Sequence, residues 1–226
     1  PKRRLFGEIV KVFEQSGRVV PVFSDKHLED DWADIAWFYG EVQRLKIPLM
    51  AGSSLPVTWR MPSIDMPFGA EVEEVLCVAI GGVDSYDFHA LEVLQSMVES
   101  RASGETGVQS VQYLGQDALW RAAQAGQWSP DLLLAALNAQ PKRQGGLLTE
   151  QQLPTTISWG LLLRYQDGLR GLVVKTSQNT TDWHFACRRA GEQQPLATSF
   201  YVGPWRNRCL FKALSHAIQT FFRTGK

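Results

Sequence analysis

The sequence has 226 residues, of which 44% are hydrophobic and 11% aromatic, and this composition supplies a packed core. Its 23 Lys and Arg balance 23 Asp and Glu, so the chain lacks the excess positive charge that dominates nucleic-acid affinity. No apolar stretch approaches the ~20 residues that cross a bilayer, and no signal-peptide core follows the basic start. We expect a soluble, cytoplasmic protein with no nucleic-acid or membrane partner.

Cys77, Cys187 and Cys209, which are far apart and flanked by apolar residues, favour buried free thiols.

The first 60 residues predict a helix followed by a βαβ unit. Residues 4–15 have one apolar helical face, and the apolar runs 19–23 and 47–50 are typical of buried strands on either side of a helix that includes residues 32–42. A right-handed crossover makes two such strands parallel. The polar segments that follow them, 24–27 and 51–54, are therefore expected at one edge of the sheet, where open α/β sheets bind ligands.

The remaining residues predict an α+β domain that begins after a proline-rich crossing at 55–69. Strands are expected at 71–80, 108–114, 157–165, 169–176, 183–189 and 197–202, and helices at 89–101, 130–137 and 208–222. Residues 166–168, Gln-Asp-Gly, indicate a hairpin. We expect strands joined mainly by hairpins into a largely antiparallel open sheet that helices cover on one face.

The segment 81–89 joins a predicted strand to a predicted helix and carries two aspartates and a histidine, Asp84, Asp87 and His89. An aspartate at such a junction commonly serves as the N-cap of the helix. A metal site built from His27, Asp87 and His89 is a weaker reading, because two-residue spacing without a further cluster is not a typical zinc pattern. A serine hydrolase is weaker still, since Gly52-Ser53-Ser54 lacks the Gly-x-Ser-x-Gly elbow.

Three short motifs resemble the glucose-fructose oxidoreductase and inositol dehydrogenase family, Gfo/Idh/MocA. Asp25-Lys26-His27 stands where the family has Glu-Lys-Pro, and residues 51–54 stand at the turn after the next strand. Ser85-x-Asp87-x-His89-x-x-Glu92 resembles the family's Asp-x-Gly-x-His-x-x-Asp, and residues 104–111 resemble the stretch that leads into the next strand. Ser85 stands where that pattern has its leading Asp, and Asp87 stands where it has Gly. The likeness is to an uncharacterised branch of the family.

The resemblance implies an α/β fold in which the C-terminal part of a Rossmann-type parallel sheet, residues 1–60, is followed by an α+β domain for substrate binding and oligomerisation, residues 61–226. The family's Gly-x-Gly-x-x-Gly unit is absent from these residues. We therefore expect a truncated chain, shortened at both ends, that lacks the main segment for NAD or NADP and is inactive alone. The full-length parent is expected to form a homo-oligomer, with the open sheet as its interface.

The resemblance also assigns roles, each of which is an expectation. The catalytic residues are Lys26, His89 and Asp87, with Asp87 or Asp84 supporting the histidine. The residues implied for the cofactor are Asp25, Lys26, Gly52 and Ser53. The residues implied for a small-molecule substrate are His27, Ser54 and Asp84, and no metal is implied. A lysine buried at a domain cleft loses hydration, which lowers its pKa and makes it a usable base.

The function implied is hydride transfer between a nicotinamide cofactor and a sugar, a polyol or a related hydroxyl compound. Two alternatives remain open. A non-catalytic relative would use the same cleft to bind a sugar or sugar acid, and the departures at His27 and Ser85 favour it. A non-redox lyase or isomerase would use Lys26 and His89 as a simple proton pair.

Overall fold

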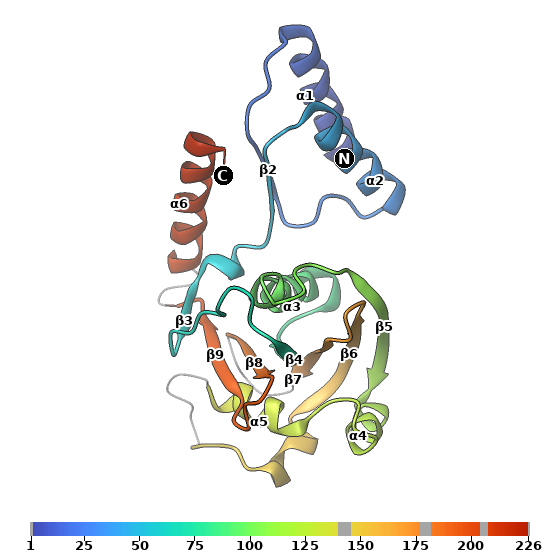
Figure 1. Cartoon of the computed structure of the whole chain (residues 1–226), viewed down its shortest axis with the longest axis vertical. Helices are drawn as coiled ribbons and strands as arrows, with labels where there is room; N and C mark the ends of the chain where they lie inside the picture. Colours follow the sequence, from blue (N-terminus) through green and yellow to red (C-terminus); the bar gives the residue numbers. More distant parts are fainter. Residues whose placement is uncertain (1, 140–145, 177–181, 204–207, 226) are drawn as a thin grey trace.

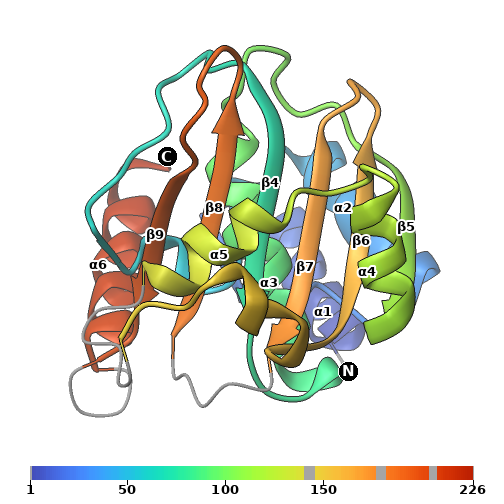
Figure 2. The ribbon, with the colours of Figure 1, turned by 90° about the horizontal axis from the view of Figure 1, so that it is seen from below.

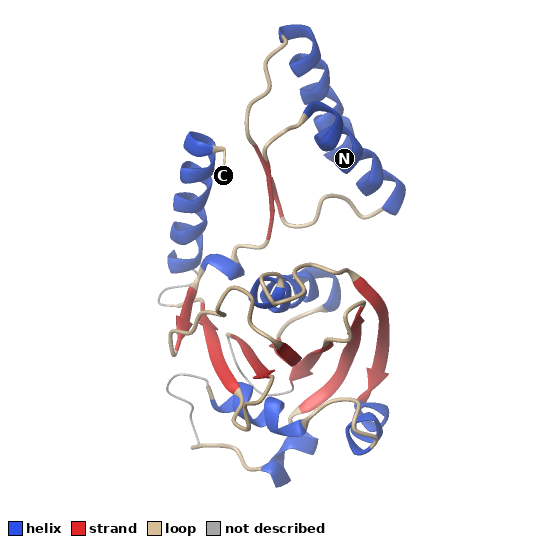
Figure 3. Cartoon of the chain, in the orientation of Figure 1, coloured by secondary structure: helices blue, strands red, loops and turns tan. Residues whose placement is uncertain are grey.

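The computed structural model describes residues 2–139, 146–176, 182–203 and 208–225. It contains a two-stranded sheet and a seven-stranded sheet, with a helix lying between them (Figures 1 and 3). The smaller sheet pairs β1 (Val22–Asp25) with β2 (Leu49–Gly52) in parallel. The larger sheet has the order β3-β9-β8-β4-β7-β6-β5. The predicted fold class is confirmed.

The small sheet packs against α1 (Lys2–Ser16) and α2 (Trp32–Leu45). Phe6 of α1 stacks on Phe38 of α2 with ring centroids 3.7 Å apart, and both side chains are buried. The Asp31 carboxylate caps α2 by accepting the backbone N–H groups of Ala33 and Asp34. The strands begin a few residues later than predicted, and Pro21, which has no N–H for a ladder, precedes the first pair. The predicted parallel βαβ unit is confirmed.

The larger sheet is mixed, with a parallel pair at its centre. Its strands are β3 (Trp59–Met61), β4 (Val72–Ala79), β5 (Val108–Gly115), β6 (Ile157–Tyr165), β7 (Arg170–Thr176), β8 (Trp183–Arg189) and β9 (Leu196–Tyr201). β4 runs parallel to β7 and antiparallel to β8, and the other pairs are antiparallel. The hairpin between β6 and β7 is confirmed, with Gly168 at a positive φ of 89°.

Helices pack on both faces of the larger sheet, whereas the sequence predicted cover on one face. The helix α3 (Val83–Val98) packs on one face (Figure 1). On the other lie α4 (Gln116–Gln124), α5 (Pro130–Asn138) and the 3-10 helix η2 (Glu150–Thr155) (Figure 2). The cause is visible in β4, where Val75 and Cys77 face one core and Leu76 and Val78 the other. α4 and α5 occupy part of one face, and the subunit interface on this sheet stays a prediction.

The connection between the sheets differs from the sequence-based reading. The expected crossing contains a short 3-10 helix, η1 (Leu55–Val57), and β3, which was not predicted and which pairs with β9. The chain thus joins the larger sheet at Trp59, and the division at residue 60 stays a prediction. The last helix, α6 (Arg208–Thr224), stands beside β2, and its Leu210 reaches the core under α3 (Figure 1).

Cys77 and Cys187 are buried and free, as predicted, while the side chain of Cys209 lies outside the described residues. Burial raises the pKa of the Cys187 thiol to about 12. Within the described ranges, no helix combines the length and apolar character required to span a bilayer.

Gly160 in β6 lies directly under α4, and replacement by alanine tests this packing. A Cβ there would lie 2.9 Å from the Val173 carbonyl oxygen and 3.2 Å from the Leu119 side chain. We expect Gly160→Ala to lower the free energy of unfolding by about 1–3 kcal/mol, measured by urea denaturation. The matched control is Gly115→Ala, where a Cβ meets nothing within 4 Å. Equal stability of both variants would contradict the packing of α4 on β6.

Candidate functional site

A pocket of about 190 Å³ lies where the loop after β1, the turn after β2, α3, the start of β8 and the start of α6 meet. Its lining residues come from all five segments: Asp25, Lys26, Ser54, Leu55, Tyr86, His89, Trp183, Leu210 and Phe211. Lys26 and His89, which the sequence predicted to face one crevice, both line it. The pocket combines an ammonium, an imidazole and a carboxylate with aromatic and aliphatic walls.

The first turns of α3 are set by a glycine turn. Gly81 has a φ of 73°, and a Cβ there would lie 2.4 Å from the Tyr86 ring, so both the backbone and the space require glycine. α3 therefore begins at Val83, whereas the sequence predicted its start near residue 89. As a consequence Asp87 and His89 lie inside the helix, where residues two apart point about 200° away from each other. The predicted cluster at a strand-to-helix junction is wrong for this reason.

His89 is held by a serine. Its Nδ1 lies 2.6 Å from the Ser53 hydroxyl oxygen, and its ring contacts Tyr86 and Trp183 at centroid distances of 6.2 Å and 6.1 Å. Burial lowers the pKa of His89, the positive charge of Lys26 lowers it further, and Asp25 opposes this weakly. Because the shift is downward from a value already below 7, the imidazole is neutral at neutral pH.

Glu92 holds the same turn one helical turn further along α3. Its Oε2 accepts the Ser53 N–H at 2.9 Å and lies so close to Gly52 that a Cβ there would be 2.3 Å away. Gly52 has a φ of 130° and tolerates the approach. Burial raises the pKa of the Glu92 carboxyl, and the Ser53 N–H opposes that shift. His89 and Glu92, spaced i and i+3, therefore grip the Gly52–Ser53 turn from one helix face.

Asp87 has a different partner from the one expected. It forms a buried ion pair with Lys175 of β7, whose ammonium also donates to the carbonyl oxygens of Ile80 and Gly81 at 2.8 Å and 3.1 Å. This pair joins β7, the Gly81 turn and the start of α3. The expectation that Asp87 supports His89 is not met, because the helix directs its carboxylate to the opposite side.

Lys26 stands at the carboxyl end of β1, where its N–H donates to Gly52 O at 3.0 Å. Its side chain is exposed, so the loss of hydration expected for a lysine buried at a cleft is not found in this structure. The loop around it is shaped by Lys2 of α1. The Lys2 ammonium donates to the carbonyl oxygens of Asp25, Lys26 and His27 at 2.5 Å, 2.9 Å and 2.6 Å.

The other predicted site residues divide into two groups. Asp25 and Ser54 line the pocket. Asp84 is exposed in the first turn of α3, and His27 is exposed with a φ of 22°, 3.4 Å from the Asp30 carboxylate; neither belongs to the pocket lining. Among the described residues no three His, Cys, Asp or Glu side chains converge as metal ligands would.

Sequence reasoning missed the apolar wall of the pocket and the Lys175 pair. The sequence predicts Trp183 as the first residue of the strand 183–189, and Leu210 and Phe211 as part of the helix 208–222. No local signal places these segments beside His89, because the contact depends on how β8 and α6 return to α3. The charge of Lys175 directly after the apolar run 172–174 is a clue in the sequence to a buried partner.

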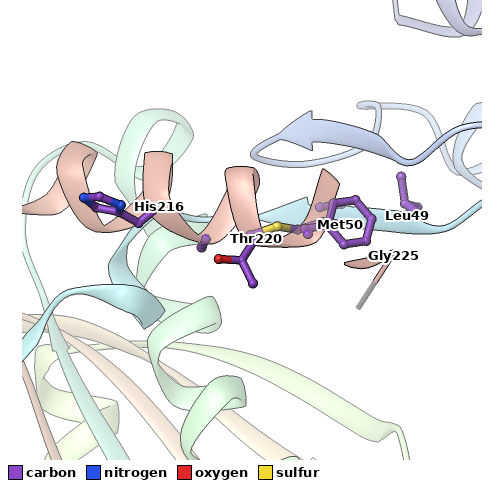
Figure 4. A pocket seen from close by; sticks show the side chains of 8 residues that line it. Leu49, Met50, His216, Thr220 and Gly225 are labelled. Carbon is purple, nitrogen blue, oxygen red and sulfur yellow. The ribbon is translucent and has the colours of Figure 1, made fainter. Parts of the chain in front are cut away.

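A larger and more open pocket, about 720 Å³, lies between β2 and α6 (Figure 4). It runs along α6 from His216 to Gly225 and is bordered by Leu49, Met50 and Ala51. His216 is the one titratable side chain among its eight lining residues. Since chemistry requires converging polar groups, we place the candidate site in the smaller pocket.

Replacement of Lys175 tests the structural role of Asp87. Lys175→Met leaves the Asp87 carboxylate buried without its counter-charge, and we expect a loss of about 3–5 kcal/mol in the free energy of unfolding. In the double variant Lys175→Met, Asp87→Leu, most of this stability should return, measured by urea denaturation. A Lys175→Met protein as stable as the parent would contradict the ion pair.

Replacement of Lys2 tests the support of the Lys26 loop. In Lys2→Met the carbonyl oxygens of residues 25–27 lose their common donor, so we expect faster amide hydrogen exchange in this loop and unchanged exchange in β4. Arg4→Met, an exposed neighbour on α1, is the control. Exchange rates equal to those of the control would show that the contact does not order the loop.

No protein-family model and no curated protein matches the sequence. Solved structures do match in fold. A structure of GenD2 from gentamicin A biosynthesis in complex with NAD aligns with 97% of this chain and 66% of its own, at TM-score 0.56 and 10% identity. A myo-inositol dehydrogenase from Corynebacterium glutamicum aligns with 100% of this chain and 68% of its own, at TM-score 0.54 and 12% identity. A probable dehydrogenase from Thermotoga maritima aligns with 97% of this chain and 67% of its own, at TM-score 0.54 and 11% identity.

The chain thus spans about two thirds of the length of the structures it matches. At these identities the likeness concerns the fold. Together with the parallel β1–β2 pair and the seven-stranded sheet, it shows that this chain has the fold of the matching part of these dehydrogenase structures, in agreement with the fold that the motifs implied.

Proposed function

We propose that this chain carries the substrate end of an NAD(P)-dependent oxidoreductase that acts on a hydroxyl group of a sugar, a polyol or a related compound. One observation carries the proposal: Lys26 and His89, from separate parts of the fold, line one pocket. The structural neighbours described as a myo-inositol dehydrogenase and as GenD2 in complex with NAD support the class of reaction.

In this proposal Lys26 moves the proton. In the direction of reduction the Lys26 ammonium gives a proton to the reacting oxygen, held between Lys26 Nζ and the His89 ring, as the carbon gains hydride; in the direction of oxidation Lys26 Nζ takes that proton back as the carbon loses hydride. The bound nicotinamide supplies the chemistry of hydride acceptance or donation. His89, neutral because burial and Lys26 lower its pKa, orients the reacting oxygen through a hydrogen bond.

The walls of the pocket favour a ligand that is polar at one end and has an apolar face. Tyr86 and Trp183 lie with ring centroids 5.9 Å apart beside His89, while Asp25 and Ser54 add a carboxylate and a hydroxyl to the lining. The C–H face of a sugar or polyol ring fits such aromatic surfaces, and its hydroxyl groups pair with the polar groups.

Of the four residues expected to contact the cofactor, two are accessible to it and two already have partners within the chain. Asp25 and Lys26 are exposed at the carboxyl end of β1, where open α/β sheets bind ligands, and they are the candidates for contact with a nicotinamide group. Gly52 and Ser53 have other partners: Glu92 occupies the space at Gly52, and Ser53 binds Glu92 and His89. We therefore limit the proposed contacts of this chain with NAD or NADP to Asp25 and Lys26.

Replacement of Lys26 tests the function. In the full-length protein we expect Lys26→Ala to lower kcat about 10²–10⁴-fold, because the proton acceptor is lost. The same change should raise the pKa of His89 toward its ordinary value, because Lys26 lowers it. Turnover is followed by the absorbance of reduced nicotinamide, and the pKa by histidine NMR; Lys11→Ala on α1 is the control.

The rival functions give different results in these assays. Turnover of a sugar or sugar acid without a change in nicotinamide absorbance would identify a lyase or isomerase. Saturable ligand binding without turnover or nicotinamide binding, the latter measured by emission of the reduced cofactor, would identify a binding protein. Near-normal turnover of Lys26→Ala would exclude Lys26 as the base.

A further inference from the structure

The turn that follows β2 is tied to α3 at two points, and the contact at His89 decides which ring nitrogen is available. Nδ1 is occupied by the Ser53 hydroxyl at 2.6 Å. The remaining nitrogen, Nε2, is therefore the one that a ligand in the pocket can reach.

The hydrogen bonds of Ser53 determine the tautomer. Its Oγ already accepts the Leu55 N–H at 3.0 Å, and the side chain is buried, with 8% exposed. A buried hydroxyl proton requires an acceptor, and among the described residues the one within reach is Nδ1 of His89. The Ser53 O–H therefore donates to an unprotonated Nδ1, which leaves the proton of the neutral ring on Nε2.

The position of Ser53 is itself fixed from α3. Glu92 Oε2 accepts the Ser53 N–H at 2.9 Å, and the close approach of this carboxylate to Gly52 leaves no room for a side chain at residue 52. Since Glu92 and His89 lie on the same face of one helix, the serine and the imidazole that it orients are attached to a common rigid element.

We propose that Ser53 is a positioning residue that holds His89 in its Nε2–H tautomer, with Glu92 fixing the serine, so that His89 serves the site as a hydrogen-bond donor to the reacting oxygen. This rests on the proposed function. The proposal changes the expected role of Ser53 from contact with the cofactor to orientation of His89. It also makes the group that supports His89 a neutral hydroxyl, where the sequence predicted the carboxylate of Asp84 or Asp87. A serine stabilises the neutral ring, whereas a carboxylate would stabilise the imidazolium.

The charged and titratable groups that face His89 must be considered together in any pH experiment. They are Asp25 at the end of β1, Lys26 directly after it, and Tyr86 and Glu92 from α3. Substitution of Ser53 changes none of these charges, so it isolates the effect of the hydroxyl.

The test uses ¹⁵N NMR of histidine-labelled protein, with the His89 signals assigned by comparison with His89→Gln. In the parent we expect protonated Nε2 and unprotonated Nδ1 at neutral pH. In Ser53→Ala the Nδ1–H form should appear and the pKa of His89 should rise, because a donor to the neutral ring is lost. Ser53→Thr keeps a hydroxyl and should retain the parent pattern. Ser96→Ala, which removes a hydroxyl bound to Val93 O elsewhere on α3, should leave the pattern unchanged.

Activity of the full-length protein gives the second readout. Ser53→Ala should lower kcat more than it changes KM, with recovery in Ser53→Thr. Protonation of Nδ1 in the parent, or an unchanged tautomer in Ser53→Ala, overturns the proposal. If Ser53→Ala does not fold, the spectrum of the parent decides the outcome by itself. A changed tautomer with unchanged kcat also overturns it. The failure of this proposal can be told apart from the failure of the proposed function. The turnover of Lys26→Ala tests the function, whereas the ¹⁵N NMR spectrum reports the tautomer of His89 without substrate.

Discussion

The contact between α3 and the Gly52–Ser53 turn is the constraint on which the site depends. Two side chains of one helix, His89 and Glu92, bind the side chain and the backbone of Ser53. This contact places the end of the small sheet, with Lys26 beside it, against the helix that covers the large sheet.

α3 is fixed independently on its other side. The Lys175–Asp87 ion pair and the hydrogen bonds from Lys175 to Ile80 and Gly81 attach the start of the helix to β7 and to the turn that follows β4. One face of α3 therefore attaches the helix to the larger sheet through Asp87, and the opposite face contributes His89 to the candidate site. The two carboxylates of α3 that the motif brought together, Asp87 and Glu92, serve these separate purposes.

The environment of the two basic groups limits what each can do. His89 is partly buried between aromatic rings and has a lowered pKa, whereas Lys26 is exposed at the end of a strand. The structure thus pairs a neutral imidazole with an accessible amine at one pocket. Tyr86, Trp183 and Phe211 line the same pocket and supply its aromatic surfaces.

Much of the fold follows from local sequence alone. Apolar periodicity predicted α1, α2 and most strands, and the order strand-helix-strand determined that β1 and β2 run parallel, so the positions of Lys26 and of the Gly52–Ser53 turn at one edge were predictable. Tertiary structure alone decided that α4 and α5 cover the second face of the sheet, that α3 begins before Asp87, and that Ser53 is the partner of His89. The physical reason is that strand and helix patterns depend on neighbours along the chain, whereas the direction of a helical side chain and the identity of its partner depend on where the helix begins and on which distant turn packs against it.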